Sequence, residues 1–207
     1  LRPIGSIALS FEKENGEIER VEEIYGFSAE STIFDVFGIS FIAGDPMDYY
    51  EDMFSIVITE SMAARYFGED DPMGKQLQLE GTELYFTVKG LIPDCPENSH
   101  LNYEFLIPLK TIRANMVDNG MADLYYSKGW AGLYKYIRLK ENVNPQSVMD
   151  RMDEFTYHYY LPVYDDSTDI LATQLMHLQP VRDIHLHSHL EEEVQVNGNI
   201  TYIIVFG

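Results

Sequence analysis

The chain has 207 residues, of which 45% are hydrophobic and 23% are charged, a composition typical of a folded globular protein rather than a disordered one. It contains 34 acidic and 14 basic residues, which gives a formal net charge of -20. Such a surface repels phosphate backbones, which excludes nucleic acid as a partner. Cys95 is the single cysteine, so an internal disulfide is excluded as well.

The first part of the chain predicts a β-hairpin followed by a short helix. Residues Ile4–Phe11 and Ile18–Phe27 are rich in strand-forming residues. Asn15-Gly16 between them favours a tight turn, because both residues tolerate a positive φ. Ser31–Phe37 predicts a helix for which Ser31 is a suitable N-cap.

The middle of the chain predicts a strand, a helix and two further strands. Phe54–Thr59 is a compact apolar segment typical of a central strand. Glu60–Phe67 predicts a helix that Thr59 can cap. Its apolar face consists of Met62, Ala63, Tyr66 and Phe67. Strands are also predicted over Lys75–Glu80 and Leu84–Ile92.

The next segment predicts a loop, a strand and a helix. Pro93–His100 has the composition of a loop, in which we expect His100 to satisfy backbone groups. Tyr103–Ile107 predicts a strand, and Pro108 suits the beginning of a helix. Asp118–Gly132 is rich in glycine and irregular, as in a hinge or a long surface loop.

The last third predicts a strand–helix–strand unit. The strands are expected over Tyr134–Leu139 and Thr173–Val181, and Asn144-Pro145 marks the beginning of the helix. We expect its buried stripe to be Val148, Met152, Phe155 and Tyr159. Ile200–Gly207 is apolar and suits either a buried terminal strand or the start of a membrane span, which would need about 20 apolar residues.

Catalysis has little support in the sequence. It contains no Gly-x-Ser-x-Gly elbow, no phosphate-binding glycine-rich loop and no Cys-x-x-Cys pair. His185, His187 and His189 would share one face of a strand, and imidazole is a good ligand for zinc or copper. Three positions along one strand do not form a tetrahedral site without a bend. We therefore predict no enzymatic activity, no metal site and no cofactor.

A set of short motifs stands in order along the middle of the chain. They are Phe34-Asp35-Val36-Phe37-Gly38, Gly44-Asp45, Ile56–Ala63, Tyr66-Phe67-Gly68, Asp71–Lys75, Val88-Lys89-Gly90 and Asp94–His100. Together they resemble the periplasmic core domain of MacB-type, FtsX-like permeases, in the variant common in Bacteroidetes-like bacteria. Asp183–Leu186, before the apolar C-terminal segment, is similar to the family's approach to its second transmembrane helix. The glycines are suited to turns and close backbone approach rather than to catalysis.

The resemblance implies an α+β fold: a porter-like βαβ layer with an inserted mixed α/β, sabre-like subdomain. Residues 1–30 and 134–196 would form the layer, and residues 31–133 the insertion. Residues 200–207 would begin a transmembrane helix.

The resemblance also implies a function. The chain would be the extracytoplasmic, periplasmic domain of an inner-membrane ABC transporter permease, which couples cytoplasmic ATP hydrolysis to export or extraction of a substrate by conformational change. Its partners would be a cytoplasmic ABC ATPase subunit, a second permease copy, and a periplasmic adaptor or lipoprotein. We expect Ile184 and Leu186 to anchor a connector, Asp183–Asn199, that transmits the movement. Two alternatives are a ligand- or lipoprotein-binding or sensing domain without transport, and a metalloenzyme built on the histidines.

Overall fold

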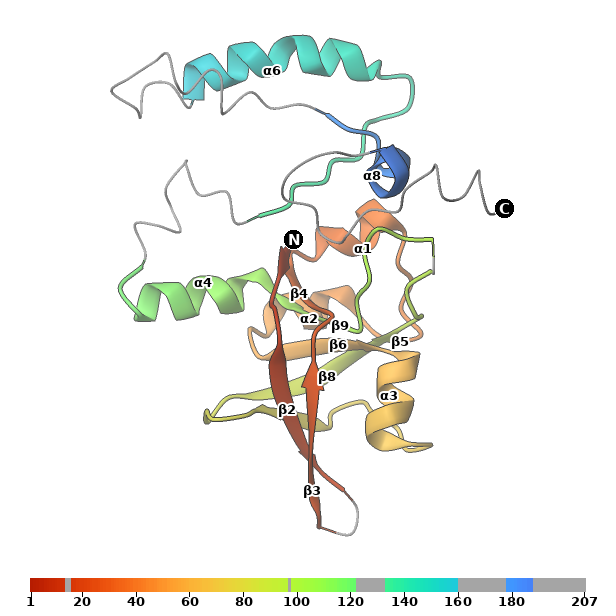
Figure 1. Ribbon diagram of the computed structural model, residues 1–207, viewed down its shortest axis with the longest axis vertical. Coiled ribbons are helices and arrows are strands. Elements are labelled where there is room, and N and C mark those ends of the chain that lie inside the picture. Colours follow the sequence, from red (N-terminus) through yellow and green to blue (C-terminus); the bar gives the residue numbers. More distant parts are fainter. Residues whose placement is uncertain (14–15, 97, 122–132, 160–177, 188–207) are drawn as a thin grey trace. The chain divides into compact units, whose positions relative to one another are not determined.

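The computed structural model describes residues 1–13, 16–96, 98–121, 133–159 and 178–187. The chain divides into two compact units, each of which is considered by itself. The first comprises residues 1–125 and 132–136, and the second comprises residues 126–131 and 137–207. Their helices and strands are labelled in Figure 1.

The first unit carries all nine strands found among the described residues, together with four helices. The strands are β1 (Arg2–Pro3), β2 (Ile7–Glu12), β3 (Ile18–Glu23), β4 (Gly26–Ala29), β5 (Ala43–Gly44), β6 (Ser55–Thr59), β7 (Gln76–Leu79), β8 (Tyr85–Ile92) and β9 (Phe105–Pro108). The helices are α1 (Thr32–Phe37), α2 (Pro46–Glu51), α3 (Glu60–Phe67) and α4 (Leu109–Asp118). The second unit contains α6 (Pro145–Tyr159) and α8 (Val181–His187).

The strands form one mixed sheet in the order β1-β4-β9-β6-β8-β7-β2-β3, and β5 pairs with β8. The β4–β9 and β6–β8 pairs are parallel, and the other pairs are antiparallel. β1 and β2 follow each other closely in the chain, but β1 is the first strand in this order and β2 is the last but one, so the sheet must curl to let one short segment connect them. Figure 1 shows the β2–β3 hairpin extending beyond the other strands of this unit.

The central strand and the helix after it form as the sequence predicts. β6 is buried along its whole length and lies between β9 and β8. The Thr59 hydroxyl accepts a hydrogen bond from the Met62 backbone nitrogen at 3.3 Å and caps α3. The four residues predicted for the inner face of α3 are all buried. The predicted hairpin is confirmed by the antiparallel pairing of β2 with β3.

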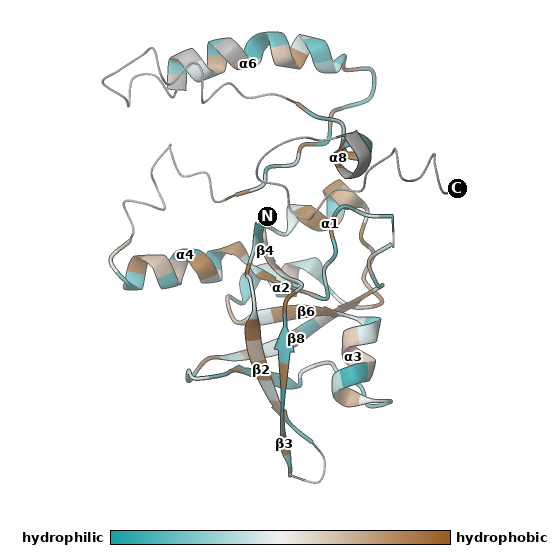
Figure 2. Ribbon diagram, in the orientation of Figure 1, coloured by the Kyte–Doolittle hydropathy of each residue, from teal (hydrophilic) through white to brown (hydrophobic). Residues whose placement is uncertain are grey.

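The two faces of the sheet carry different apolar clusters, because alternate residues of a strand point to opposite sides. Ile56 and Ile58 of β6 belong to the inner core together with the buried face of α3. Figure 2 shows the hydrophobic colouring of β6 and part of β2. Gly90 faces the other side, where a side chain would collide with the Phe41 ring and approach Val57 Cγ2 at 2.9 Å. The predicted role of this motif glycine in close approach is therefore confirmed.

The α+β class is confirmed, and the predicted division of the chain into a layer and an insertion stays a prediction. β1–β4 fall within residues 1–30, which we expected to stand apart from an insertion at 31–133. They hydrogen-bond into the same sheet as β6–β9, because the curl brings β2 to β7 and β4 to β9. The assignment of residues 134–196 to the same layer as residues 1–30 stays a prediction.

Several predictions for the last third are wrong. Tyr134–Leu139 belongs to no strand. Val181, expected at the end of a strand, begins α8. The helix at Pro145 is confirmed, but Phe155 of its expected buried stripe is 44% exposed. The predicted strand residues 173–177 and the apolar segment 200–207 lie outside the described residues. Within the described part of the chain, no helix is long and apolar enough to cross a membrane.

Candidate functional site

The two ends of the first unit meet at one place. The backbone nitrogen of Tyr134 donates to the Leu1 carbonyl at 2.8 Å, and the Leu1 nitrogen donates to the Tyr134 carbonyl at 3.1 Å. The segment that leaves the unit therefore runs beside its first residue. We call the group formed by Leu1, Tyr134, Tyr136, His100 and Phe37 the junction.

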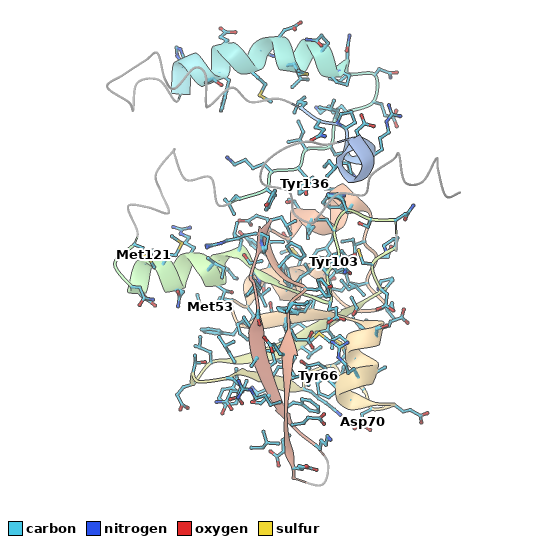
Figure 3. The ribbon with its side chains drawn as sticks, in the orientation of Figure 1. Met53, Tyr66, Asp70, Tyr103, Met121 and Tyr136 are labelled. Atoms are coloured by element: carbon cyan, nitrogen blue, oxygen red, sulfur yellow. The ribbon has the colours of Figure 1, made fainter. Side chains whose placement is uncertain are left out.

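A buried histidine holds the departing segment at the junction. His100 Nε2 and the Tyr136 hydroxyl are 3.0 Å apart, and their ring centroids are 5.4 Å apart. The Tyr136 ring also meets Phe37 of α1 edge to face at 4.9 Å. Figure 3 shows Tyr136 close to α1. His100 was expected to satisfy loop backbone groups, and its contact with a tyrosine 36 residues away was not predicted.

A cavity of about 380 Å³ opens beside the junction. Its lining includes Leu1, Glu30, Ile33 and Tyr134. The lining mixes backbone, aromatic and charged groups, and no constellation of nucleophile, base and oxyanion donors is present among its described residues. Nothing in this geometry indicates catalysis.

The predicted loop 93–100 ties the junction to α3. Asp94 accepts hydrogen bonds from the Ser61 backbone nitrogen at 3.0 Å and from the Ser61 hydroxyl at 2.6 Å. Burial opposes the charge on Asp94, but the bonds from Ser61 keep the pKa of this carboxyl below its usual range. A carboxylate in this position also suits the positive end of the α3 dipole. The loop thus binds α3 at one end and, through His100, Tyr136 at the other.

A polar cluster lies one helical turn further along α3, where Arg65 joins two carboxylates. Its guanidinium is 2.7 Å from Glu23 and 2.7 Å from Glu104. The Tyr66 hydroxyl donates to Glu23 at 2.7 Å, and Figure 3 shows Tyr66 at α3. Glu23 is buried at the end of β3, where its partner residue across the strands is Ile7.

The pKa values of the two carboxylates in this cluster are shifted in opposite directions. Burial raises the pKa of Glu23, and a hydrogen bond with Glu104 adds to this increase against the opposing effects of Tyr66 and Arg65. Burial opposes ionisation of Glu104 too, but its bonds with Arg65 and Glu23 keep its pKa below the usual range. Glu23 therefore resists ionisation more than Glu104 does, and Arg65 and Tyr66 join these groups into one network within the first unit.

The residues singled out in the C-terminal part do not assemble into a described site. Ile184 and Leu186 lie in α8 rather than in the extended connector that we expected, and Ile184 is half-buried. His185 and His187 belong to the same helix, so the strand geometry assumed for them is wrong. His189 lies outside the described residues. Among the residues that are described, no group of three or more potential ligands is placed to hold a metal ion.

Sequence reasoning missed the junction and the Arg65 cluster for different reasons. The Glu23 contact could have been expected from the sequence, because a carboxylate at the end of a strand and close to apolar residues needs a cationic partner when it is buried. Tyr136 carried none, since its partners His100 and Phe37 come from distant segments.

Comparison with known proteins agrees with this fold. The sequence matches the MacB-like periplasmic core domain family over residues 3–155. A comparison with curated protein sequences gives no significant match. A solved domain of a candidate permease protein from Porphyromonas gingivalis aligns with a TM-score of 0.57 and 22% identity, over 76% of this chain and 62% of that one. This chain thus spans less than two thirds of that solved domain.

Two other solved structures align less closely. The periplasmic region of MacB from Actinobacillus actinomycetemcomitans gives a TM-score of 0.43 and 18% identity, over 74% of this chain and 63% of that one. The extracellular domain of the noncanonic ABC-type transporter YknZ from Gram-positive bacteria gives a TM-score of 0.38 and 16% identity, over 56% of this chain and 57% of that one. The family match covers well over half of the sequence, and the chain belongs to the MacB-like periplasmic core domain family.

Proposed function

We propose that this chain is the extracytoplasmic domain of an ABC transporter permease in the inner membrane. In this proposal it couples ATP hydrolysis by a cytoplasmic ATPase subunit to export or extraction of a substrate outside the membrane. It acts by changing conformation and not by catalysis. Family membership and the absence of a catalytic arrangement among the described cavity residues support this choice.

The observation that carries the proposal is the junction. The first and last segments of the β-rich unit are joined by two backbone hydrogen bonds, and Tyr136 is fixed to His100 and Phe37. A force applied through the flanking segments would therefore act on the unit at a single place. The continuous sheet would then move as one rigid body, as expected in a hinge or rigid-body mechanism.

The remaining features of the proposal follow from the family. We propose that residues 200–207 begin a transmembrane helix and that residues 134–196 include the layer nearest to it. Partners would be a second permease copy and a periplasmic adaptor or lipoprotein. Ile184 and Leu186 of α8 would transmit the movement between this helix and the rest of the domain.

The experiment that tests the proposal measures movement in the intact permease with its ATPase. A spin label at Ile18→Cys on the exposed β2–β3 hairpin, in a Cys95→Ser background, reports the distance between two copies. We expect a non-hydrolysable ATP analogue to change this distance. Tyr136→Phe, which removes the bond to His100 but keeps the ring, should reduce the change while ATP hydrolysis continues.

Ile184→Gly combined with Leu186→Gly should have the same effect. Tyr25→Phe, which alters an exposed tyrosine of the same unit, is the matched control and should respond like the unsubstituted protein. A distance that does not respond to nucleotide in the unsubstituted permease would contradict coupling by movement. That result would favour the alternative, a ligand- or lipoprotein-binding or sensing domain without transport.

A further inference from the structure

The inner face of the curled sheet leaves a larger and more apolar cavity than the one at the junction. It lies between the sheet and α4 and has a volume of about 510 Å³. Its floor includes Leu9, Ile56 and Phe105, which are completely buried. Its opening includes Phe54, which is 37% exposed.

The cavity exists because the two helices on this face fill it unequally. The apolar face of α3 packs into one half of the inner core. Ile112 of α4 packs against this core, but the other α4 residues that line the cavity are Thr111, Ala114, Asn115 and Asp118, which recur at helical spacing. They are short or polar, whereas a helix stripe that faces a core is normally apolar. Figure 3 shows Met53, another lining residue, beside α4.

The size and lining of this cavity indicate a binding site rather than a packing defect. Native interiors rarely contain voids larger than a water molecule. Apolar cavities of about 150 Å³ already bind small apolar molecules such as benzene. Ligand sites span about 300 to 1,000 Å³ and combine apolar walls with a few polar groups, which is the composition found here.

The polar groups at the opening select the charge of the ligand. Asp118 is the one charged side chain among the described residues that line the cavity, and it lies with Asn115 on the exposed side of α4. The carboxylate of Asp118 would attract a cationic group and repel an anionic one, and the amide oxygen of Asn115 would add a partial negative charge. The formal net charge of -20 acts in the same direction.

We propose that this cavity binds the apolar body of a small cationic amphiphile. The alkyl or aromatic part lies over Leu9, Ile56 and Phe105, and the cationic group lies at Asp118 and Asn115. This site does not depend on the transport role proposed above, because binding is a property of this chain alone. Its failure and the failure of coupling can therefore be told apart.

The test uses the 207-residue chain, one fluorescent dye and three competing compounds. N-Phenyl-1-naphthylamine, a neutral aromatic dye, reports occupancy by its fluorescence. Decyltrimethylammonium and decanoate have equally long chains and opposite charges, and both compete for the dye below their micelle concentrations. We expect stoichiometric dye binding, displacement by decyltrimethylammonium, and at least about tenfold weaker displacement by decanoate. Tetramethylammonium, which lacks the chain, should displace nothing.

Substitutions locate the binding. Ala114→Phe adds bulk inside the cavity and should weaken dye binding about tenfold or more, whereas Val117→Phe places the same phenyl ring at an exposed position of α4 and should leave it unchanged. Leu84→Trp narrows the cavity from the sheet side and should weaken binding too, which keeps the test open if Ala114→Phe does not fold. Asp118→Asn should reduce the preference for the cationic probe, and the surface control Glu69→Gln should not.

The substitutions test the position of the site, and the two decyl compounds test the charge of its ligand. Loss of binding in both cavity variants, with retention in Val117→Phe, supports the site. Dye binding that is absent, or that persists in Ala114→Phe and Leu84→Trp, overturns it. Equal displacement by the two decyl compounds overturns the cationic assignment.

Discussion

The Tyr49 hydroxyl should contribute measurably to stability, because it lies where two buried parallel strands end. The side chain is completely buried. Its hydroxyl lies 2.9 Å from the Ala29 carbonyl and 2.6 Å from the Ile107 carbonyl, and burial raises its pKa far above the usual value. Tyr49→Phe removes the hydroxyl but keeps the edge-to-face contact with Phe34 at 5.2 Å between ring centroids.

The magnitude follows from the geometry. The hydroxyl has one proton to share between two carbonyl oxygens, so its removal leaves both without this donor in a buried place. A lost buried hydrogen bond costs about 1 kcal/mol, and a buried polar group left without a partner costs about 1–3 kcal/mol. We therefore expect Tyr49→Phe to lower the free energy of unfolding by about 1–2 kcal/mol.

Urea unfolding followed by circular dichroism measures this change, with an unchanged m-value showing that the same surface is exposed on unfolding. Tyr50→Phe is the matched control, because the neighbouring tyrosine is exposed, and it should change the stability by less than about 0.5 kcal/mol. Equal midpoints for the two variants would refute the reasoning and show that the carbonyls are satisfied without Tyr49.

Three further predictions test the polar and close-packed contacts. The raised pKa of Glu23 means that the folded chain holds this proton more tightly than the unfolded chain does. The contribution of Glu23 to the free energy of unfolding is therefore complete below the unfolded pKa of about 4.3 and is lost as the pH rises through the folded pKa. Glu23→Gln should reduce this loss of stability in urea unfolding between pH 4 and pH 8, and an unaltered pH profile would exclude Glu23 as its source. Asp94→Ala should cost about 1 kcal/mol by removing its bonds to Ser61 at the start of α3, whereas no change in the unfolding midpoint would mean that water replaces it. Gly90→Ala should lower the free energy of unfolding by about 1–3 kcal/mol, because the added methyl group meets the Phe41 ring. A thermal unfolding midpoint equal to that of the unsubstituted protein would show that the ring moves aside freely.

Local signals predicted the centre of the fold well. Phe54–Thr59 and Glu60–Phe67 combine an apolar segment, a capping threonine and a clear helical face, and the structure has β6 and α3 in these places. Tyr134–Leu139 shows where such signals fail. Its strand-like composition comes from aromatic residues, and Tyr136 uses its ring to contact His100 and Phe37 instead of entering the sheet.

The candidate sites depend on long-range pairing that no local pattern encodes. The inner cavity requires Leu9, Phe105 and α4 to surround one space, and these come from opposite ends of the first unit. The junction requires Leu1 to find Tyr134. The family resemblance predicted the class of protein but could not place these contacts, because its motif residues serve turns, caps and close packing.

The order of the strands also sets the order in which the unit can be completed as the chain is synthesised. The β2–β3 hairpin needs only neighbouring residues and can form at once. β2 must then wait for β7, which pairs Leu9 with Leu79, and β4 must wait for β9, which pairs Gly26 with Phe105. Until then the first strands offer unpaired edges to other chains. Contacts so distant in sequence slow folding, so we expect ribosome-bound chains that end before β9 to be protease-sensitive, and resistance to appear only after Pro108 has left the ribosome.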